Sequence, residues 1–256
     1  MFKKINKENN ENEELDFVES QEKIAKTIEE LPRYVSPSTD PVDRSSLVSY
    51  AQEMLDCGAD FLHCDVMDGV AVSRTTINEK DIYQVRKKVP KMKLDIHLMT
   101  VGNCATVKKY VRLKPYAVTV QYEFFDYEKE LIKVLKTISS SKAKCGISIS
   151  PSTPISYITP YLKFLDIILI MGVEPGASGQ KLIPGTINKV KEVKNIKNKL
   201  KSSLIIAFDG GVNYSNSGEL YMAGVDVLVS GSTVYNSFDR AYAIRSLRSG
   251  VEPLIK

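Results

Sequence analysis

The stretch Phe61-Leu62-His63-Cys64-Asp65-Val66-Met67-Asp68-Gly69 begins as an apolar run and carries one of the two histidines of the chain. Side chains two residues apart on a β-strand project to the same face, so a strand here presents the His63 imidazole and the Asp65 carboxylate together. The stretch Leu94-Asp95-Ile96-His97-Leu98-Met99 repeats the arrangement with the second histidine and Asp95. Imidazole and carboxylate are ligands for Zn²⁺ or a similar divalent cation.

A histidine in an apolar run has a second interpretation. Taken singly, it is more commonly a hydrogen-bonded core residue than a metal ligand. Buried carboxylates need partners, however, and one metal ion would satisfy both histidines and their aspartates. The pattern alone leaves a hydrogen-bonded core and a metal site open. By the same alternation, Cys64 faces away from His63 and Asp65 and is interpreted as a core residue.

Outward from these two stretches, apolar strand-like runs alternate with amphipathic helical patterns eight times. The strands are near-continuous apolar runs, which is typical of parallel sheets covered on both faces. Eight repeats predict a closed (β/α)₈ TIM barrel, an α/β fold, rather than an open sheet. The sequence contains no Walker A motif and no G-x-G-x-x-G after the first predicted strand, so a Rossmann fold has little support. The predicted strands are 34–36, 61–66, 92–98, 117–122, 144–149, 165–171, 204–208 and 225–229, and the predicted helices are 47–57, 82–89, 105–113, 127–138, 155–162, 186–200, 217–223 and 240–248.

The 256 residues divide at Pro32. Residues 1–32 form a charged N-terminal extension, helical or mobile, whose first part is too rich in Asn, Lys and Glu to order by itself. We expect residues 33–256 to form one barrel domain. The extension carries 5 Lys and 9 Asp/Glu, whereas the remainder carries 30 Lys/Arg and 22 Asp/Glu, a net charge of +8. A basic domain is compatible with an anionic small substrate.

Composition disfavours several partners and locations. The sequence contains no tight cluster of arginines of the kind that would indicate nucleic acid binding. No apolar stretch reaches the roughly 18 residues of a membrane span, and residues 1–31 lack the apolar core of a secretory leader. The four cysteines include no C-x-x-C pair, so we expect reduced thiols in a cytoplasmic protein.

Polar and glycine residues gather where the predicted strands end, which is where (β/α)₈ barrels hold their active sites. The glycines after the sixth, seventh and eighth strands offer free backbone N–H groups to a phosphate, although each by itself could simply make a tight turn. These strand-end segments are Ser36-Pro37-Ser38, His63 to Gly69, His97, Gln121 to Glu123, Gly172 to Gln180, Asp209-Gly210-Gly211 and Gly231-Ser232.

The carboxylates at the strand ends suggest a reaction. Asp65 ends the second strand and Asp209 the seventh, so both can approach a central ligand from separate sides of the ring. A metal ion between them would polarise a substrate carbonyl and stabilise an enediolate. Two carboxylates flanking the acidified carbon can exchange its proton on either face, which predicts inversion next to a ketone.

Over roughly residues 33–248 the chain resembles the ribulose-phosphate 3-epimerase family. The H-x-D-V-M-D-G stretch from His63 and the D-x-H-L-M stretch from Asp95 carry the resemblance most specifically. Further matching segments, in the family's order, are Ser36-Pro37-Ser38, Pro175-Gly176 with Gly179-Gln180, Asp209 to Asn213, and Gly231-Ser232.

The resemblance implies interconversion of ribulose 5-phosphate and xylulose 5-phosphate, with Asp65 and Asp209 as the acid/base pair. It implies one divalent metal ion held by His63, Asp65, His97 and Asp209. Zn²⁺ is favoured, but this ligand set also accepts Mn²⁺, Fe²⁺ or Co²⁺. A sugar phosphate partner and a homo-oligomer are expected. The implied substrate contacts are Ser38, His97, Gly176, Ala177, Ser178, Gly179, Asp209, Gly210, Gly211, Gly231 and Ser232.

Four segments depart from the family pattern. Thr39-Asp40-Pro41 replaces an apolar segment, Val70-Ala71-Val72-Ser73-Arg74 replaces H-F-V-P-N, Gln121 replaces a histidine, and Ala177-Ser178 alters a P-G-F-G-G-Q loop. Met67, Met99 and Met171 match family methionines over the site, or are simply core. The departures keep two alternatives open: a 3-epimerase for a hexulose phosphate such as allulose 6-phosphate, and a divergent sugar-phosphate-binding paralogue with little activity. A barrel lyase with a D-x-K-x-x-D pattern is disfavoured, because His97 stands in place of the lysine.

Overall fold

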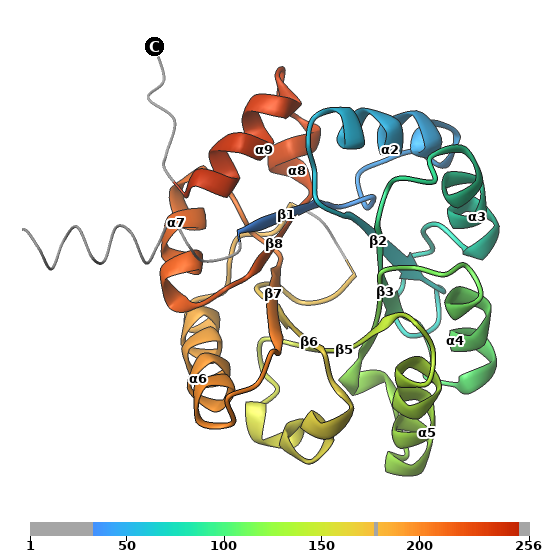
Figure 1. Cartoon of the computed structure of the whole chain (residues 1–256), viewed down its shortest axis with the longest axis vertical. Coiled ribbons are helices and arrows are strands. Elements are labelled where there is room, and N and C mark those ends of the chain that lie inside the picture. Colours follow the sequence, from blue (N-terminus) through green and yellow to red (C-terminus); the bar gives the residue numbers. More distant parts are fainter. Residues whose placement is uncertain (1–32, 177–178, 251–256) are drawn as a thin grey trace, which may run out of the picture. The chain divides into compact units, whose positions relative to one another are not determined.

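A computed structural model describes residues 33–176 and 179–250 of the chain (Figure 1). Eight strands form one parallel sheet in the order β1-β8-β7-β6-β5-β4-β3-β2. They are β1 (Tyr34–Pro37), β2 (Leu62–Met67), β3 (Leu94–Met99), β4 (Ala117–Gln121), β5 (Lys144–Ile149), β6 (Ile167–Met171), β7 (Ile205–Asp209) and β8 (Val227–Ser230).

The two edge strands of this sheet, β1 and β2, meet and nearly close the ring. Ser38 forms a parallel bridge with His63, and the Thr39 N–H donates to the His63 carbonyl over 2.8 Å. At the other end of the pair, the Asp60 N–H donates to the Val35 carbonyl over 3.1 Å. The predicted (β/α)₈ TIM barrel is therefore confirmed.

Helices surround the strands in Figure 1. Most predicted element ends agree with the structure within three residues. The helices are α2 (Leu47–Asp56), α3 (Glu79–Lys88), α4 (Cys104–Val111), α5 (Glu128–Ser139), α6 (Thr186–Lys199), α7 (Tyr214–Ala223), α8 (Ser232–Tyr235) and α9 (Arg240–Ser249), with short 3₁₀ helices at Arg44–Ser46, Tyr122–Phe124, Ile155–Tyr157 and Thr159–Phe164.

Helices α3 and α7 each begin three residues before their predicted start, and both have a capping box. Asn78 accepts from the Asp81 N–H while the Asp81 side chain accepts from the Asn78 N–H. Asn213 and Asn216 make the equivalent exchange at the start of α7. These caps satisfy backbone N–H groups that the first helical turn leaves unpaired, so the helix extends beyond its apolar stripe.

The predicted helix at 155–162 is wrong. The segment forms two 3₁₀ helices, Ile155–Tyr157 and Thr159–Phe164, with Pro160 in the first turn of the second. Proline has no N–H to donate and its ring clashes with the carbonyl four residues earlier, so one α-helix cannot run through this position. The four-residue helix α8 was also not predicted, because four residues are too few to show a helical spacing of apolar side chains.

The strands separate two apolar layers. Residues facing outward, such as Leu62, Cys64 and Val66 of β2, pack in a large cluster with the helices. A smaller cluster inside the barrel includes Phe61, Leu169 and other inward-facing residues. Cys64 lies in the outer layer, as strand alternation predicts. Among the described residues, no helix is long and apolar enough to cross a membrane. Residues 1–32 lie outside the described part, so the domain boundary stays a prediction.

Arg86 of α3 joins the starts of two strands that carry site residues. Its guanidinium donates to the carbonyls of Leu113 and Lys114, which precede β4, over 3.2 and 3.0 Å. It also donates to Pro90 and Met92, which precede β3, over 3.3 and 3.4 Å. One side chain therefore satisfies four carbonyls that the strand ladders do not use.

We expect Arg86→Met to lower the free energy of unfolding by about 1–3 kcal/mol, because methionine keeps the apolar stem but leaves these carbonyls without a donor. Urea denaturation followed by circular dichroism measures the change. Lys87→Met, at the exposed neighbouring position, is the matched control and should change little. Equal effects of the two substitutions would contradict this role of Arg86.

Candidate active site

Four ligand-type side chains converge at the carboxyl ends of three strands. His63 and Asp65 come from β2, His97 from β3 and Asp209 from β7, and one ligand atom of each lies within 4.8 Å of the others. The His63 Nε2 atom is 3.4 Å from Asp65 Oδ1 and 3.8 Å from Asp209 Oδ2. The His97 Nδ1 atom is 3.6 Å from Asp65 Oδ1. Both imidazoles are fully buried.

The tautomer of His63 is set by Asp95. The register of β2 and β3 places these residues opposite each other, and Asp95 Oδ2 lies 2.7 Å from His63 Nδ1. An ionised carboxylate only accepts hydrogen bonds, so in the neutral imidazole the proton resides on Nδ1. The lone pair of Nε2 is then free to face Asp65 and Asp209.

The tautomer of His97 is set by Gln121, the last residue of β4, and by Glu123 in the 3₁₀ helix that follows. The Gln121 amide donates from Nε2 to the Glu123 carboxylate over 2.5 Å and to Ser150 Oγ over 3.2 Å. Gln121 Oε1 therefore points to His97 and accepts from its Nε2 over 3.0 Å. This leaves His97 Nδ1 as the unprotonated nitrogen, turned toward Asp65.

These two nitrogens, His63 Nε2 and His97 Nδ1, are buried and have no hydrogen-bond partner within the described part of the chain. An unpartnered buried polar atom is costly in a folded protein. Both face the same two carboxylates, and two imidazole nitrogens with two carboxylate oxygens suit a tetrahedral Zn²⁺ or a similar cation. The residues present therefore fit a divalent metal ion, and Asp95 and Gln121 would orient its imidazole ligands.

The pKa values of the two central carboxyl groups shift in opposite directions. Burial raises the pKa of Asp209, and the facing Asp65 carboxylate raises it further, to about 7. Burial also raises the pKa of Asp65, but the positive charge of His63 and, to a lesser extent, of His97 outweighs burial and holds the pKa of Asp65 below the usual range. Burial lowers the pKa of His63, but Asp65 and Asp95 outweigh burial and hold it well above the usual value.

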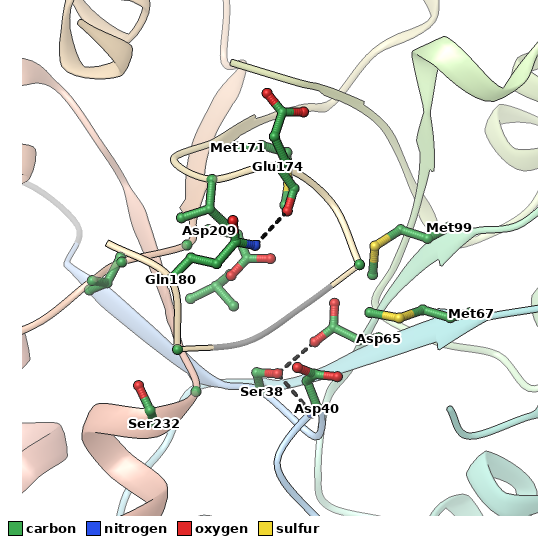
Figure 2. A pocket seen from close by; sticks show the side chains of 18 residues that line it. Ser38, Asp40, Asp65, Met67, Met99, Met171, Glu174, Gln180, Asp209 and Ser232 are labelled. Atoms are coloured by element: carbon green, nitrogen blue, oxygen red, sulfur yellow. Dashed lines mark hydrogen bonds between the residues drawn. The ribbon is translucent and has the colours of Figure 1, made fainter. Parts of the chain in front are cut away.

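A pocket opens above this cluster (Figure 2). Asp65 and Asp209 form part of its wall, and Ser38 Oγ donates to Asp65 Oδ2 over 2.6 Å. The lining residues are Ser38, Asp40, Asp65, Met67, Met99, Met171, Val173, Glu174, Gly176, Gly179, Gln180, Asp209, Gly210, Gly211, Val212, Val229, Gly231 and Ser232.

Two glycines of the wall cannot be replaced without strain. Gly210 has a φ of 105°, and a Cβ there would lie 2.5 Å from Val173 Cγ2. Gly211 has a φ of 71°, and a Cβ there would lie 2.6 Å from the Leu182 nitrogen. The β6 and β7 loops therefore approach each other closely at this side of the pocket, and both backbone conformations favour glycine.

The structure brings most of the predicted site residues together. Nine of them line the pocket: Ser38, Asp65, Gly176, Gly179, Asp209, Gly210, Gly211, Gly231 and Ser232. His97 lies behind Asp65 and is not among the lining residues. Met67, Met99 and Met171 are buried core residues that also line the pocket. Ala177 and Ser178 lie outside the described residues.

The sequence pattern grouped Asp95 with the carboxylates that one metal ion would satisfy, but the structure places Asp95 on His63 Nδ1 and outside the group of four ligand-type side chains. The pattern assigned no role to Gln121 or Asp40. A signal for Asp95 was present, because aligning H-x-D of β2 with D-x-H of β3 in parallel places Asp95 beside His63 and His97 beside Asp65. Gln121 was noted only as a departure from the family pattern. Its role depends on Glu123 and Ser150, which no local pattern connects to His97.

The fold and the site define an enzyme class: a (β/α)₈ barrel with a candidate divalent-metal centre under a glycine-lined pocket at the carboxyl ends of its strands. The sequence profile of the ribulose-phosphate 3 epimerase family matches residues 34–235. The chain belongs to this family, whose named members are carbohydrate epimerases.

Two relatives show the extent of the similarity. The ribulose-phosphate 3-epimerase of Bacillus subtilis is 34% identical over 215 residues, which are 84% of this chain and 97% of the relative. That of Buchnera aphidicola is 32% identical over 198 residues, which are 77% of this chain and 86% of the relative. A solved structure of 3-hexulose-6-phosphate synthase has a TM-score of 0.63 at 14% identity, covering 85% of this chain and 99% of that chain, and supports the fold alone.

We expect Asp95→Asn to weaken Zn²⁺ binding by about 10–100-fold, because an amide can donate to His63 Nδ1 and favour the wrong tautomer. Competition with a chromophoric chelator measures the affinity. Asp226→Asn is the matched control: Asp226 and Asp95 are both 8% exposed, but Asp226 accepts from the Ile206 N–H far from the site. Unchanged affinity in Asp95→Asn would contradict the tautomer argument.

Zn²⁺ binding should release protons below about pH 7. In the metal-free site, Asp209, with a pKa of about 7, and His63, with a raised pKa, both hold a proton at about pH 6, and a cation competes with both protons. The apparent affinity should therefore fall as the pH decreases through 7, about tenfold per pH unit for each proton released. Calorimetric titrations in two buffers of different ionisation enthalpy count the protons. The same count at about pH 6 and about pH 8 would contradict this prediction.

Proposed function

We propose that this protein is a metal-dependent epimerase that inverts C3 of a ketose phosphate and interconverts ribulose 5-phosphate and xylulose 5-phosphate. The observation that carries the proposal is the pair Asp65 and Asp209. They come from separate strands, face one pocket, and have pKa values shifted in opposite directions. Two carboxyl groups held in different protonation states are the arrangement that acid/base catalysis requires.

The two carboxyl groups divide the proton transfers between them. One carboxylate, Asp65 when ionised, takes the C3 proton of the substrate, and the C–H electron pair moves toward the C2 carbonyl oxygen to form an enediolate. The protonated Asp209 then donates its proton to the opposite face of C3, which inverts that carbon. At the end of the reaction Asp65 is protonated and Asp209 is ionised. The pair can then catalyse the reverse reaction, or it regains its first protonation state by exchanging protons with solvent.

A divalent ion held by His63, Asp65, His97 and Asp209 would supply positive charge to the carbonyl oxygen as the enediolate forms. Zn²⁺ is the metal that two imidazoles and two carboxylates favour, and Mn²⁺, Fe²⁺ and Co²⁺ are compatible with the same set. Asp95 and Gln121 contribute by holding each imidazole in the required tautomer. Ser38 contributes a hydrogen bond that fixes the Asp65 carboxylate.

The glycine-rich side of the pocket supports binding of the substrate phosphate. Gly210, Gly211, Gly231 and Ser232 follow β7 and β8, where (β/α)₈ barrels frequently bind phosphate. Small residues there allow a phosphate to approach the backbone N–H groups. A homo-oligomeric assembly and a cytoplasmic location stay predictions from the sequence.

The test of this function follows C3 hydrogen exchange and epimerisation in ²H₂O by NMR. We expect Asp65→Asn and Asp209→Asn each to lower the epimerisation rate by about 10²–10⁴-fold, because each variant lacks one of the two proton-transfer groups. Each variant should still exchange C3 of only one epimer, the one whose proton faces the remaining carboxylate. The wild-type protein should exchange and invert both.

Asp166→Asn, at the amino end of β6, is the control and should retain wild-type rates. Because both tested aspartates are also proposed ligands, the metal content of each variant is measured alongside the rate. Wild-type epimerisation by a fully folded Asp209→Asn protein would overturn the mechanism. Comparing kcat/KM for ribulose 5-phosphate and allulose 6-phosphate decides between the pentulose and hexulose substrates.

A further inference from the structure

Asp40 is a buried carboxylate that the proposed mechanism does not use. It lies just after β1, lines the pocket, and its side chain is only 6% exposed. Its N–H donates to Ser38 Oγ over 2.9 Å, and that hydroxyl donates to Asp65. Figure 2 shows Asp40 beside Ser38 and below Asp65. Two hydrogen bonds therefore connect Asp40 to the proposed base.

Arg74 of the β2 loop holds the Asp40 carboxylate in place. Its Nη1 atom donates to Asp40 Oδ2 over 3.2 Å. Its Nη2 atom lies 2.8 Å from Asp40 Oδ1 as an ion pair, but that buried oxygen accepts no hydrogen bond from the described residues. Arg74 also donates to the Gly176 carbonyl of the β6 loop over 3.4 Å, and a Cβ on Gly176 would lie 3.3 Å from Val72 Cβ. The loops after β1, β2 and β6 therefore meet at Arg74.

The pocket wall has an unusual charge for an anionic substrate. Its described lining residues include four acids and no lysine or arginine. Asp65 and Asp209 belong to the candidate metal centre, and Glu174 is exposed to solvent. Asp40 is the remaining acid, and its side chain is paired with Arg74. Its Oδ1 atom is nevertheless buried without a hydrogen-bond partner among the described residues, which is costly unless a ligand supplies a donor.

The proposed function places the ends of the substrate. With the phosphate at the β7 and β8 loops and C3 between Asp65 and Asp209, the other end of the carbon chain lies on the side of the carboxylate pair away from Ser232. The β1 loop extends from beside Gly231, which faces Ser38 and Pro41, to Asp40 below Asp65 (Figure 2). In Figure 2 Met67 and Met99 lie on the side of the pocket away from Ser232, and thioethers are weak hydrogen-bond acceptors. Ser38 already donates to Asp65. Asp40 is the strong acceptor in this region.

We propose that Asp40, positioned by Arg74, accepts a hydrogen bond from the C1 hydroxyl of the ketose phosphate and so determines specificity for substrates that carry this hydroxyl. The inference rests on the proposed function. An ionised carboxylate has about four acceptor sites. Asp40 Oδ1, which has no hydrogen-bond partner among the described residues, can therefore accept from a hydroxyl while Oδ2 accepts from Arg74. Arg74 acts through Asp40 and is a positioning residue.

The experiment compares xylulose 5-phosphate with 1-deoxyxylulose 5-phosphate, which has the same reacting carbon but lacks the C1 hydroxyl. The ratio of their kcat/KM values, measured by C3 exchange in ²H₂O, is the specificity. We expect the wild-type protein to favour the hydroxylated substrate by about 10–100-fold, as for a hydrogen bond to a charged group. Asp40→Leu should reduce this ratio to about 1, because leucine cannot accept a hydrogen bond.

Two further variants sharpen the test. Asp40→Asn should retain an intermediate ratio because its amide oxygen still accepts, and it replaces Asp40→Leu if that protein does not fold. Arg74→Gln should reduce the ratio by a few-fold. Arg248→Gln is the matched control: Arg248 forms a 2.7 Å ion pair with Asp60, before β2 at the amino ends of the strands, and the ratio should not change.

The outcomes distinguish a failure of the proposed epimerase function from a failure of the proposed role of Asp40. If the folded wild-type protein exchanges C3 of neither substrate, the proposed function fails. If it turns over xylulose 5-phosphate and the folded Asp40 variants keep the wild-type ratio, the proposed role of Asp40 fails. The inhibition constant of inorganic phosphate should be the same in all variants. If the inhibition constant of inorganic phosphate rises in Arg74→Gln by the same factor as KM, Arg74 is a phosphate ligand and its role as a positioning residue is overturned.

Discussion

The parallel register between β2 and β3 is the constraint on which the site depends. It places His63 beside Asp95 and Asp65 beside His97, so each imidazole meets a carboxylate on the neighbouring strand. A slip of one residue would turn these polar side chains outward, because successive residues on a strand face opposite sides. Cys64 and its outward-facing neighbours resist that slip, because they are buried against the helices. The packing of the outer layer therefore aims the polar residues into the barrel.

Burying four ionisable side chains together opposes folding, and the surrounding hydrogen bonds determine what chemistry results. Asp95 and the Gln121–Glu123 pair occupy one nitrogen of each imidazole and leave the other without a partner. A divalent cation there would offset the repulsion between the carboxylates and would bind both unpartnered nitrogens. The same burial and repulsion separate the pKa values of Asp65 and Asp209, so one arrangement would suit both the proposed metal binding and the proposed proton transfer.

The strand ends supply the reactive groups, whereas the loops form the walls that select a substrate. Asp40 and Arg74 come from two segments that depart from the family pattern, yet they form an ion pair with each other. These two departures are therefore structurally matched. They place a charged wall beside the candidate metal centre without altering any of its four ligands.

Local sequence patterns determined the eight strands, the barrel, and the residue types of the candidate metal centre, because strand periodicity and apolar runs are set by neighbours along the chain. Helix 155–162 was mispredicted where Pro160 interrupts an otherwise helical pattern. Only the tertiary structure decided which residues pair. Asp95 shares a strand face with His97 but bonds His63, and Asp40 meets Arg74 across 34 residues of chain. Such partners depend on the register between strands and on the closure of the ring, which bring distant segments together and leave no periodic signal in either one.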